Sequence, residues 1–375
     1  MAKRWILYFW YRCIGALFRI MPIEKKTIVF SSFFGKGYGD SPKFIAEEML
    51  RNEKYKIVWL VRDWKQGTFP KTIKVVKRGT IEELYYLSVA HMWVDNERKP
   101  LGLKKRKNQY YIQTWHSNLR LKKIEKDAEE YLPKEYIKCA KNDSKMIDAM
   151  IAGSEFGYNT IRNSFWYDGP IYKTGIPRCD ELFNIDPKEI KKTKEKLNIE
   201  SYSRIYLYAP TFRNNKEIDL SKIDELVQKL DAAYGNGYKL LVRFHPLSKQ
   251  IIKETSKIIN VTSYPDIQEL INTANILITD YSGCMFDAII AHKPCILFTP
   301  DCEEYIKNER ELYFDFEELP FENTHTFSEL ADAIISFRQD DYNKKANAFL
   351  KKIGCYEKGE SSKNVAALVE KLMEE

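Results

Sequence analysis

Short runs of apolar and β-branched residues alternate along the chain with longer stretches in which charged residues recur at helical spacing. This alternation is typical of βα units built around parallel sheets. It predicts a first series of strands at 27–33, 55–61, 73–76, 91–95, 110–115, 150–153 and 171–174. A second series is predicted at 204–209, 239–244, 260–263, 276–279 and 295–298. The last two runs are almost continuously hydrophobic, as strands covered on both faces require.

The two series are separated by the polar stretch 184–203, which contains a lysine-rich helical pattern at 188–197. Residues 327–375 show helical patterns only. The sequence therefore predicts an α/β fold with two Rossmann-type, doubly wound domains and a cleft between them. We place the first domain at residues 23–184 and the second, with its helical tail, at 185–375.

Length and composition agree with two folded domains and exclude several other classes of protein. The 375 residues are 44% hydrophobic and 30% charged, which excludes global disorder. The net charge of +7 suits anionic partners without identifying one. The seven cysteines form no C-x-x-C pair, which indicates reduced thiols of a cytoplasmic protein and no zinc site.

Residues 1–22 resemble a targeting segment only at first sight. Arginines interrupt the apolar run and no small-residue cleavage site follows, so we expect neither a signal peptide nor a spanning helix. Aromatic and basic residues recur at helical spacing: Trp5, Tyr8, Phe9, Arg12, Phe18 and Arg19, with Lys3 and Arg4. Such a segment lies in a membrane interface or packs as a helix on the protein body, and both alternatives stay open.

Two of the five histidines follow predicted strands directly, where an α/β sheet binds its ligands. His116 follows the strand at 110–115, and His245 follows the strand at 239–244 and precedes Pro246. An imidazole acts as a base or, when protonated, as a cation that faces phosphate. Either histidine alone is more often structural, but equivalent positions in two domains favour function.

Polar residues near His245 indicate an anion site. Arg243 lies two residues before it, and Thr211 and Arg213 end the neighbouring strand in the segment APTFR. Arginine forks match phosphate oxygens. The strand at 276–279 runs into a turn suited to a diphosphate, formed by Thr279, Asp280, Ser282 and Gly283. Ordinary helix capping by this turn is the alternative.

Several common motifs are missing. The glycine-rich segment 35–40, before a helix predicted at Ser41-Pro42, has neither Walker A nor dinucleotide-binding spacing. Neither H-E-x-x-H nor G-x-S-x-G occurs, and Asp315-Phe316-Glu317 is interpreted as a solvated loop, so no metal is expected. The basic cluster 104–107 lacks a surrounding nucleic-acid-binding module, so no nucleic-acid partner is expected.

The motifs taken in order resemble the CDP-glycerol glycerophosphotransferase family, whose enzymes act in teichoic-acid and some capsule synthesis. The resemblance extends from about Thr27 to Pro320 and rests on SFFGKGYGDSPK, QTWHS with LKKI, KTGIPRCD, YAPTFR, LLVRFHP, ILITDYSG with a later FD, and PDCEEY before ELYFDFEELP. It implies a GT-B-like fold in which the second domain holds most of the CDP-alditol donor. It also implies peripheral attachment to the cytoplasmic face of the cell membrane.

Carried onto matching positions, the resemblance implies that His116 is the acceptor-side base and that His245 lies beside the donor diphosphate. It implies a donor site lined by Thr211, Arg213, Arg243, Asp280 and Ser282. We add Thr279 and Gly283 from the same turn. The expected partners are the CDP-alditol donor, a lipid-linked glycan or teichoic-acid acceptor and the membrane surface, with no cofactor besides the donor substrate.

The expected reaction is transfer of an alditol phosphate, with glycerol phosphate expected, from a CDP-alditol to a hydroxyl of a cell-wall or capsule acceptor, with release of CMP. A ribitol donor and a GT-B glycosyltransferase that uses a nucleotide sugar are the alternative enzymes. A non-catalytic, membrane-associated nucleotide-binding protein is the alternative from another class.

Overall fold

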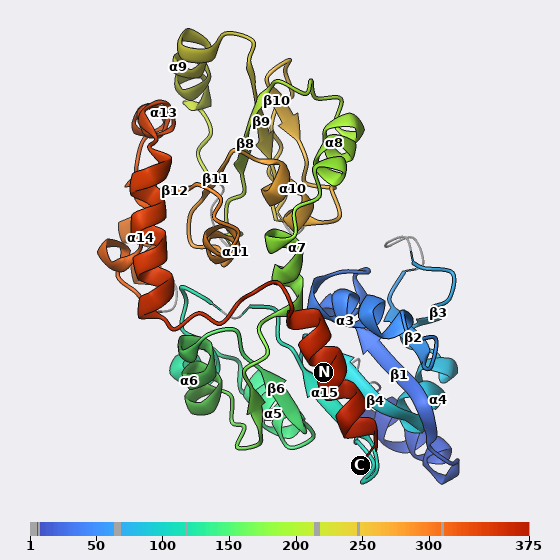
Figure 1. Ribbon diagram of the computed structural model, residues 1–375. Coiled ribbons are helices and arrows are strands. Elements are labelled where there is room, and N and C mark those ends of the chain that lie inside the picture. Colours follow the sequence, from blue (N-terminus) through green and yellow to red (C-terminus); the bar gives the residue numbers. More distant parts are fainter. Residues whose placement is uncertain are drawn as a thin grey trace. The chain divides into compact units, whose positions relative to one another are not determined.

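The structure, a computed structural model, describes residues 6, 8–63, 69–117, 119–213, 218–245, 248–308 and 311–374. The chain divides into two compact units, each built around its own sheet (Figure 1). The first unit contains Met1–Asn118, Ile124–Asp180 and Gly354–Glu375, and the second contains Leu119–Lys123 and Glu181–Ile353.

The first unit has a parallel sheet with the strand order β3-β2-β1-β4-β5-β6-β7. Its strands are β1 (Glu24–Ser31), β2 (Lys56–Val61), β3 (Lys74–Lys77), β4 (Ala90–Asp95), β5 (Tyr110–Gln113), β6 (Ala149–Ile151) and β7 (Ile171–Tyr172). The central strand β4 is buried along its whole length, which explains its hydrophobic sequence. Trp93 and Tyr111 from neighbouring strands pack edge to face in the core.

Helices connect these strands: α2 (Gly15–Leu17), α3 (Asp40–Leu50), α4 (Ile81–Val89), α5 (Lys134–Ser144), α6 (Glu155–Ser164) and α15 (Ser361–Glu374). Short 3-10 or π turns add η1 (Trp10–Ile14), η2 (Phe18–Ile20), η3 (Phe33–Gly35), η4 (Glu125–Tyr131) and η5 (Pro177–Cys179). Local caps fix several starts: Thr80 accepts from the Glu83 N–H before α4, and Ser154 accepts from the Gly157 N–H before α6. Helix α3 begins one residue before its predicted start.

The second unit repeats the plan with the strand order β10-β9-β8-β11-β12-β13. Its strands are β8 (Arg204–Tyr208), β9 (Tyr238–Val242), β10 (Ile258–Asn260), β11 (Ile276–Thr279), β12 (Cys295–Phe298) and β13 (Glu322–Thr324). All predicted strands have a counterpart in the structure. The hydrophobic pattern does not predict β13, because this short strand is polar and lies at the sheet edge.

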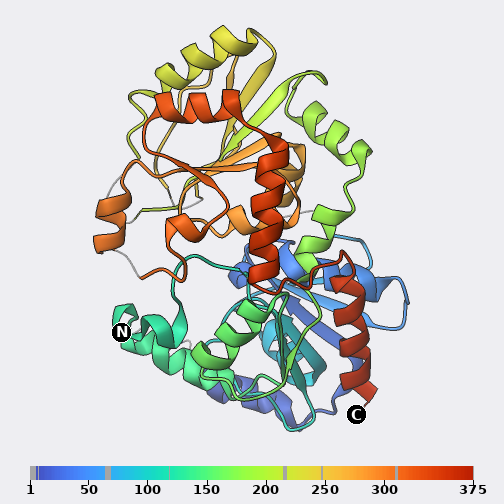
Figure 2. The same ribbon diagram turned by 60° about the vertical axis from the view of Figure 1, so that its left-hand side comes forward.

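The helices of the second unit are α7 (Asp180–Phe183, which begins at the unit boundary), α8 (Pro187–Lys196), α9 (Ile223–Tyr234), α10 (Ile267–Thr273), α11 (Cys284–Ile290), α12 (Cys302–Asn308), α13 (Phe327–Ser336) and α14 (Gln339–Lys352), with the turn η6 (Phe316–Glu318). Helices α9 and α13 lie side by side, yellow and orange-red at the top of Figure 2. Leu230 and Leu330 from these helices join Leu240, Ile278 and other strand residues in one core.

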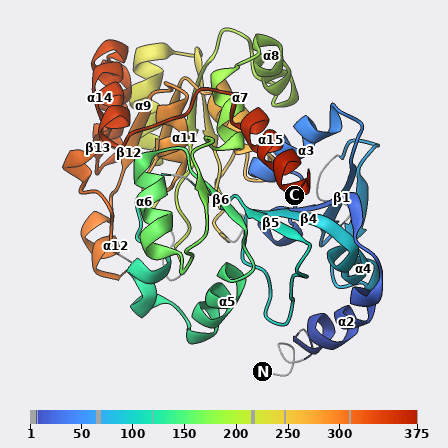
Figure 3. The same cartoon turned by 60° about the horizontal axis from the view of Figure 1, so that its bottom comes forward.

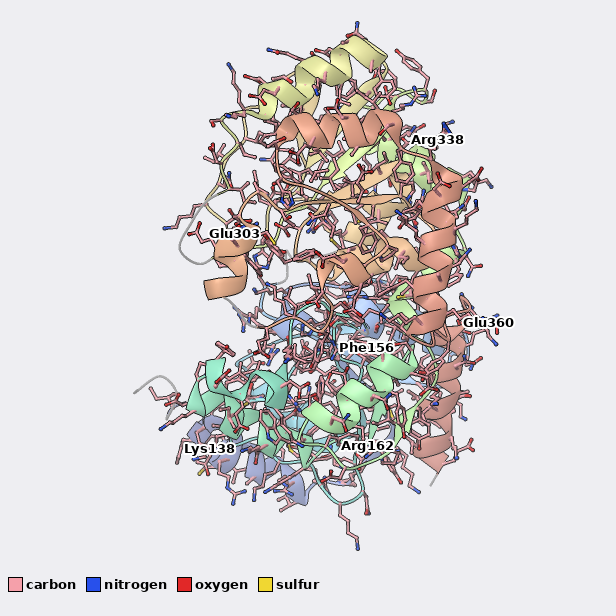
Figure 4. The ribbon with its side chains drawn as sticks, turned by 90° about the vertical axis from the view of Figure 1, so that its left-hand side faces the viewer. Lys138, Phe156, Arg162, Glu303, Arg338 and Glu360 are labelled. Atoms are coloured by element: carbon pink, nitrogen blue, oxygen red, sulfur yellow. The ribbon has the colours of Figure 1, made fainter. Side chains whose placement is uncertain are left out.

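Helix α15 corrects the predicted domain boundary. Its first N–H groups, from Ser361 and Ser362, donate to the Asp180 carboxylate at 2.8 and 2.6 Å, and the helix packs along α3 (Figure 1). In Figure 4, Glu360 marks its start and Arg338 the start of α14. The predicted second domain included the whole tail and began at residue 185, whereas residues 354–375 belong to the first unit and the division falls after Asp180. Periodicity identifies a helix but not the sheet that it covers.

Candidate active site

The two sheets have the same order over six strands, and this order locates their switch points. The order reverses between β1 and β4 in the first unit and between β8 and β11 in the second. In open α/β sheets, ligands bind outside the carboxyl ends of the strands at such a point. The predicted donor residues of the second unit follow β8, β9 and β11, and His116 of the first unit follows β5. The structure thus brings most of the predicted residues to carboxyl ends of central strands.

Arg213 is the centre of a buried ion network in the second unit. Its Nη1 donates to Asp280 Oδ2 at 2.7 Å, and its Nε and Nη2 donate to the two carboxylate oxygens of Asp301 at 2.8 and 3.0 Å. Burial alone lowers the pKa of Arg213, but the two carboxylates outweigh burial and raise this pKa above its usual value. Arg213 therefore stays charged and holds two turns together.

Asp280 and Asp301 are held from other directions as well. Asp280 accepts from the Thr211 N–H at 2.8 Å and from the Tyr281 N–H at 2.6 Å. The Tyr281 hydroxyl donates to Asp301 at 2.9 Å, and the Tyr281 ring stacks on Tyr305 with centroids 3.6 Å apart. Asp280 is fully occupied in fixing the loop after β8, so its side chain positions the site rather than reaching into it.

Thr279 is also an internal contact. Its side chain is fully buried, and its hydroxyl donates to the Ala209 carbonyl at 2.7 Å, tying the ends of β8 and β11 together. The structure therefore separates the predicted donor set. Thr279, Asp280 and Arg213 bond to neighbouring protein groups. Arg243 and Thr211 instead keep polar atoms that the described residues do not satisfy.

Two buried polar atoms at the ends of β8 and β9 lack a partner in the part of the chain that the structure describes. Arg243 Nη2 donates to the Tyr264 carbonyl at 3.1 Å, yet no acceptor in the described part of the chain reaches Arg243 Nε. The Thr211 hydroxyl likewise has no hydrogen-bond partner among the described residues. Burial lowers the pKa of Arg243, and the charge of Asp266 only partly opposes this. A buried donor left unsatisfied is costly, so an anionic ligand fits these two groups.

The remaining predicted donor residues lie at the rim of the second unit. His245 is exposed, its ring centroid lies 5.4 Å from that of Phe212, and its carbonyl accepts from the Ser248 N–H at 2.8 Å. Pro246, part of the predicted motif, lies outside the described residues. Ser282 and Gly283 are partly exposed before α11, where the Ser282 hydroxyl accepts from the Cys284 N–H at 3.4 Å.

In the first unit, contacts to neighbouring residues orient the ring of His116. Its exposed ring stacks on Trp115, and its Nδ1 lies 3.3 Å from the Asn96 carbonyl oxygen. Because a carbonyl only accepts, Nδ1 carries the proton in the neutral ring, and the lone pair is on Nε2. Arg178 Nη1 donates to the His116 carbonyl at 2.5 Å and to Asp40 at 3.0 Å. These contacts fix both the backbone and the ring of His116.

Sequence reasoning missed two residues of these networks, Asp301 and Asn96. Asp301 lies directly before α12, whose second residue, Glu303, is labelled in Figure 4. Both missed residues follow a predicted strand closely, so the strand-end rule that selected His116 would have found them. The remaining histidines do not join the described networks of either site: for example, His325 Nδ1 lies 3.0 Å from the Thr299 carbonyl.

Comparison with known sequences gives one consistent family. Residues 14–371 match the model of the CDP-glycerol:poly(glycerophosphate) glycerophosphotransferase family. A teichoic acid poly(glycerol phosphate) polymerase of Staphylococcus epidermidis is 32% identical over 94% of this chain and 52% of its own length. A polymerase of the same name from Bacillus spizizenii is 29% identical over 97% of both chains. The chain thus spans about half the length of the first relative and nearly all of the second.

Solved structures agree with the sequence comparison. A histidine-to-asparagine variant of the wall teichoic acid polymerase TagF, soaked with CDPG, matches the whole chain and 96% of its own with a TM-score of 0.88 at 30% identity. A Staphylococcus aureus MnaA structure with UDP matches with a TM-score of 0.59 at 12% identity, which concerns the fold alone. The GT-B-like class is confirmed, while the predicted cleft between the domains stays a prediction. The chain belongs to the CDP-glycerol:poly(glycerophosphate) glycerophosphotransferase family.

Proposed function

We propose that this protein transfers glycerol phosphate from CDP-glycerol to a hydroxyl of a teichoic-acid or related cell-wall or capsule acceptor and releases CMP. The observation that carries the proposal is a pair of buried atoms, Arg243 Nε and the Thr211 hydroxyl, at the carboxyl ends of β9 and β8, for which the described residues provide no partner. A guanidinium and a hydroxyl at this edge suit a diphosphate. Family membership supports the donor class.

The chemistry assigned to each residue follows from its position. His116 Nε2 takes the proton of the acceptor hydroxyl, and the resulting oxygen attacks the phosphorus next to the alditol. The bond from that phosphorus to the bridging oxygen breaks, and CMP leaves with the electron pair. Arg243 and His245, with Ser282 and the Gly283 N–H, stabilise the charge that develops on the leaving phosphate. No covalent intermediate and no cofactor besides the donor enter this proposal.

Glycerol is favoured over ribitol by the relatives. Those named for glycerol phosphate are 28–32% identical to this chain. Those named for ribitol phosphate are 24–26% identical. A ribitol donor is therefore the second candidate, and a lipid-linked acceptor is part of the same proposal.

The test is CMP release by the purified protein with CDP-glycerol, CDP-ribitol and UDP-sugars, each with a synthetic glycerol phosphate oligomer as acceptor. We expect release from CDP-glycerol to exceed release from the others. Arg243→Ala is expected to weaken CDP-glycerol binding by about 1.5–3 kcal/mol, the range for a hydrogen bond to a charged group. UDP release without CMP release would replace the proposal by a glycosyltransferase, and nucleotide binding without turnover would replace it by a binding protein.

We also propose that the protein acts at the inner face of the cell membrane through its N-terminal segment. Every helix in the described part of the chain is too short or too polar to cross a bilayer. One face of the segment packs on the first unit: the Tyr11 hydroxyl donates to Glu83 at 3.1 Å, and α2 lies beside α4 (Figure 3). This face of the segment, including Phe18, packs against the core of the first unit, while Lys3, Arg4 and Trp5 lie outside the described residues.

The opposite face of the segment remains available to a membrane. Leu17 and Ile20 are 65% and 90% exposed, and Phe9 is also exposed beside the basic residues Arg12 and Arg19. Apolar side chains between arginines suit an interface of anionic lipids.

A double change of Leu17 and Ile20 to serine should lower binding to anionic vesicles at least tenfold, because each buried aliphatic side chain contributes roughly 1.5–3 kcal/mol. The melting temperature should stay the same, since both side chains are exposed. Tyr202 and Ile251, which are 75% and 84% exposed in the second unit, provide the matched double serine control. Vesicle sedimentation measures both proteins. Equal binding by the two variants would show that this face does not bind the membrane.

A further inference from the structure

The switch point of the first sheet carries polar side chains that the proposed mechanism does not yet use. Strands β1 and β4 pair in parallel with Ser31 opposite Asp95, so the next residues, Ser32 and Asn96, are level at the carboxyl edge. Strand β5 lies on the other side of β4 and leads to His116. Ser32, Asn96 and the segment of His116 therefore follow three adjacent strands. Neighbouring strands in a sheet are about 4.8 Å apart.

Asn96 connects these segments. Its Oδ1 accepts from the Phe33 N–H at 2.9 Å, and its backbone oxygen faces His116 Nδ1 at 3.3 Å. Its own N–H donates to Asp95 Oδ1 at 2.9 Å. The Asn96 carbonyl is therefore held by the strand and by the loop after β1, and it orients the ring of the proposed base. Asn96 acts as a positioning residue for His116.

Helix α3 adds a third element to the same network. Asp40, its first residue, accepts from Arg178, which also donates to the His116 carbonyl. The Ser41 N–H donates to the other oxygen of Asp40 at 2.6 Å. Ser41 is thus tied through one carboxylate and one guanidinium to the backbone of His116.

Three neutral polar groups of this network are buried without a hydrogen-bond partner among the described residues. Ser32, Ser41 and Asn96 are each fully buried, yet the Ser32 and Ser41 hydroxyls and Asn96 Nδ2 form no hydrogen bond within the described residues. Leaving such groups unsatisfied is costly, so three at the edge of the sheet that leads to His116 need an explanation. Two hydroxyls and an amide are neutral donors, and the hydroxyls also accept. This set matches the hydroxyl groups of a neutral polyol.

We propose that Ser32, Ser41 and Asn96 Nδ2 form the subsite that binds hydroxyls of the acceptor polyol beside His116. The inference rests on the proposed function, because it places the acceptor next to the base that takes its proton. Hydrogen bonds from these groups orient the attacking hydroxyl toward His116 Nε2. Orientation of this kind lowers the barrier without changing the protonation chemistry.

Serine-to-alanine variants distinguish acceptor binding by Ser32 and Ser41 from a structural role of these residues. Removing a buried hydroxyl that has no partner should leave the melting temperature unchanged or raise it, whereas removing a bonded one should lower it. Ser164 is the matched control, since it is fully buried in the same unit and donates to Asp127 at 2.5 Å. We expect Ser32→Ala and Ser41→Ala to melt at or above the wild-type temperature and Ser164→Ala to melt lower.

The kinetic part of the experiment measures KM for a synthetic glycerol phosphate oligomer and, separately, for CDP-glycerol. Ser32→Ala and Ser41→Ala should each raise the oligomer KM on the order of tenfold and leave the CDP-glycerol KM within about twofold. Ser164→Ala should change neither. An unchanged oligomer KM would overturn the proposal and leave the hydroxyls as sites of ordered water. A raised CDP-glycerol KM would overturn it by assigning the residues to the donor.

The result also distinguishes this inference from the proposed function. If the wild-type protein releases no CMP from any CDP-alditol, the proposed function fails, and a polyol subsite for transfer fails with it. If the wild type transfers glycerol phosphate and both serine variants keep its acceptor KM, only the subsite is wrong. Binding of the oligomer without donor, measured by calorimetry, should weaken in the same two variants and not in Ser164→Ala.

Discussion

Arg213→Ala is expected to destabilise the protein by about 3–5 kcal/mol, the range for removing one partner of a buried ion pair. The change leaves the Asp280 carboxylate, which is 1% exposed, without its cation, and it frees Asp301 beside the stacked tyrosines. Burial would raise the pKa of Asp301, but hydrogen bonds and charge from Arg213 reverse the direction and hold this pKa below its usual value. Denaturant unfolding of wild type and variant measures the difference.

A surface ion pair in the same unit provides the control. Lys229 Nζ lies 2.6 Å from Asp332, and their side chains are 38% and 65% exposed. Lys229→Ala should cost at most about 1 kcal/mol, since exposed pairs are screened by water and salt. A similarly small loss of unfolding free energy for Arg213→Ala would mean that Arg213 does not stabilise the buried Asp280 and Asp301 carboxylates. Arg213 would then be available for the donor phosphates.

The fold was largely predictable because its core strands are covered on both faces. Strands β11 and β12 are wholly buried, and their sequences ILIT and CILF are accordingly unbroken hydrophobic runs. Strand β13 has the sequence ENT, which carries no such pattern because it pairs on one side only. The position of α15 was not predictable, since it depends on its cap at Asp180, a carboxylate far away in the sequence.

The position of the candidate residues at strand ends was predictable, but the hydrogen bonds and ion pairs among them were not. The strand-end rule places Thr211, Arg213 and Asp280 together, and the structure confirms that they meet. The rule does not tell which side chains satisfy one another. Arg213 pairs with Asp280 and Asp301, whereas Arg243 keeps a donor without a partner among the described residues. Only three-dimensional contacts show which arginine is paired with carboxylates and which keeps a donor that the described residues do not satisfy.

His116→Ala should lower the turnover of CDP-glycerol with a glycerol phosphate oligomer by roughly 10²- to 10⁴-fold, the usual contribution of a general base. The melting temperature should stay close to wild type, because the His116 ring is exposed where it stacks on Trp115 and lies near the Asn96 carbonyl. His325 is the matched control. It is also exposed, and its Nδ1 also lies near a backbone carbonyl, that of Thr299, so His325→Ala should keep its turnover.

Calorimetric titration with CDP-glycerol then separates the base from the donor site. His116→Ala should keep donor affinity within a few-fold, because removing Nε2 removes no contact to the diphosphate. Arg243→Ala should lose roughly 10- to 150-fold in affinity, the equivalent of about 1.5–3 kcal/mol for a charge-assisted hydrogen bond. The contrast depends on Arg243 Nε, which has no partner among the described residues, and on the proton that the Asn96 carbonyl fixes on Nδ1 of His116. If His116→Ala loses donor binding as severely as Arg243→Ala, both residues bind the donor, and the assignment of His116 to the acceptor is wrong.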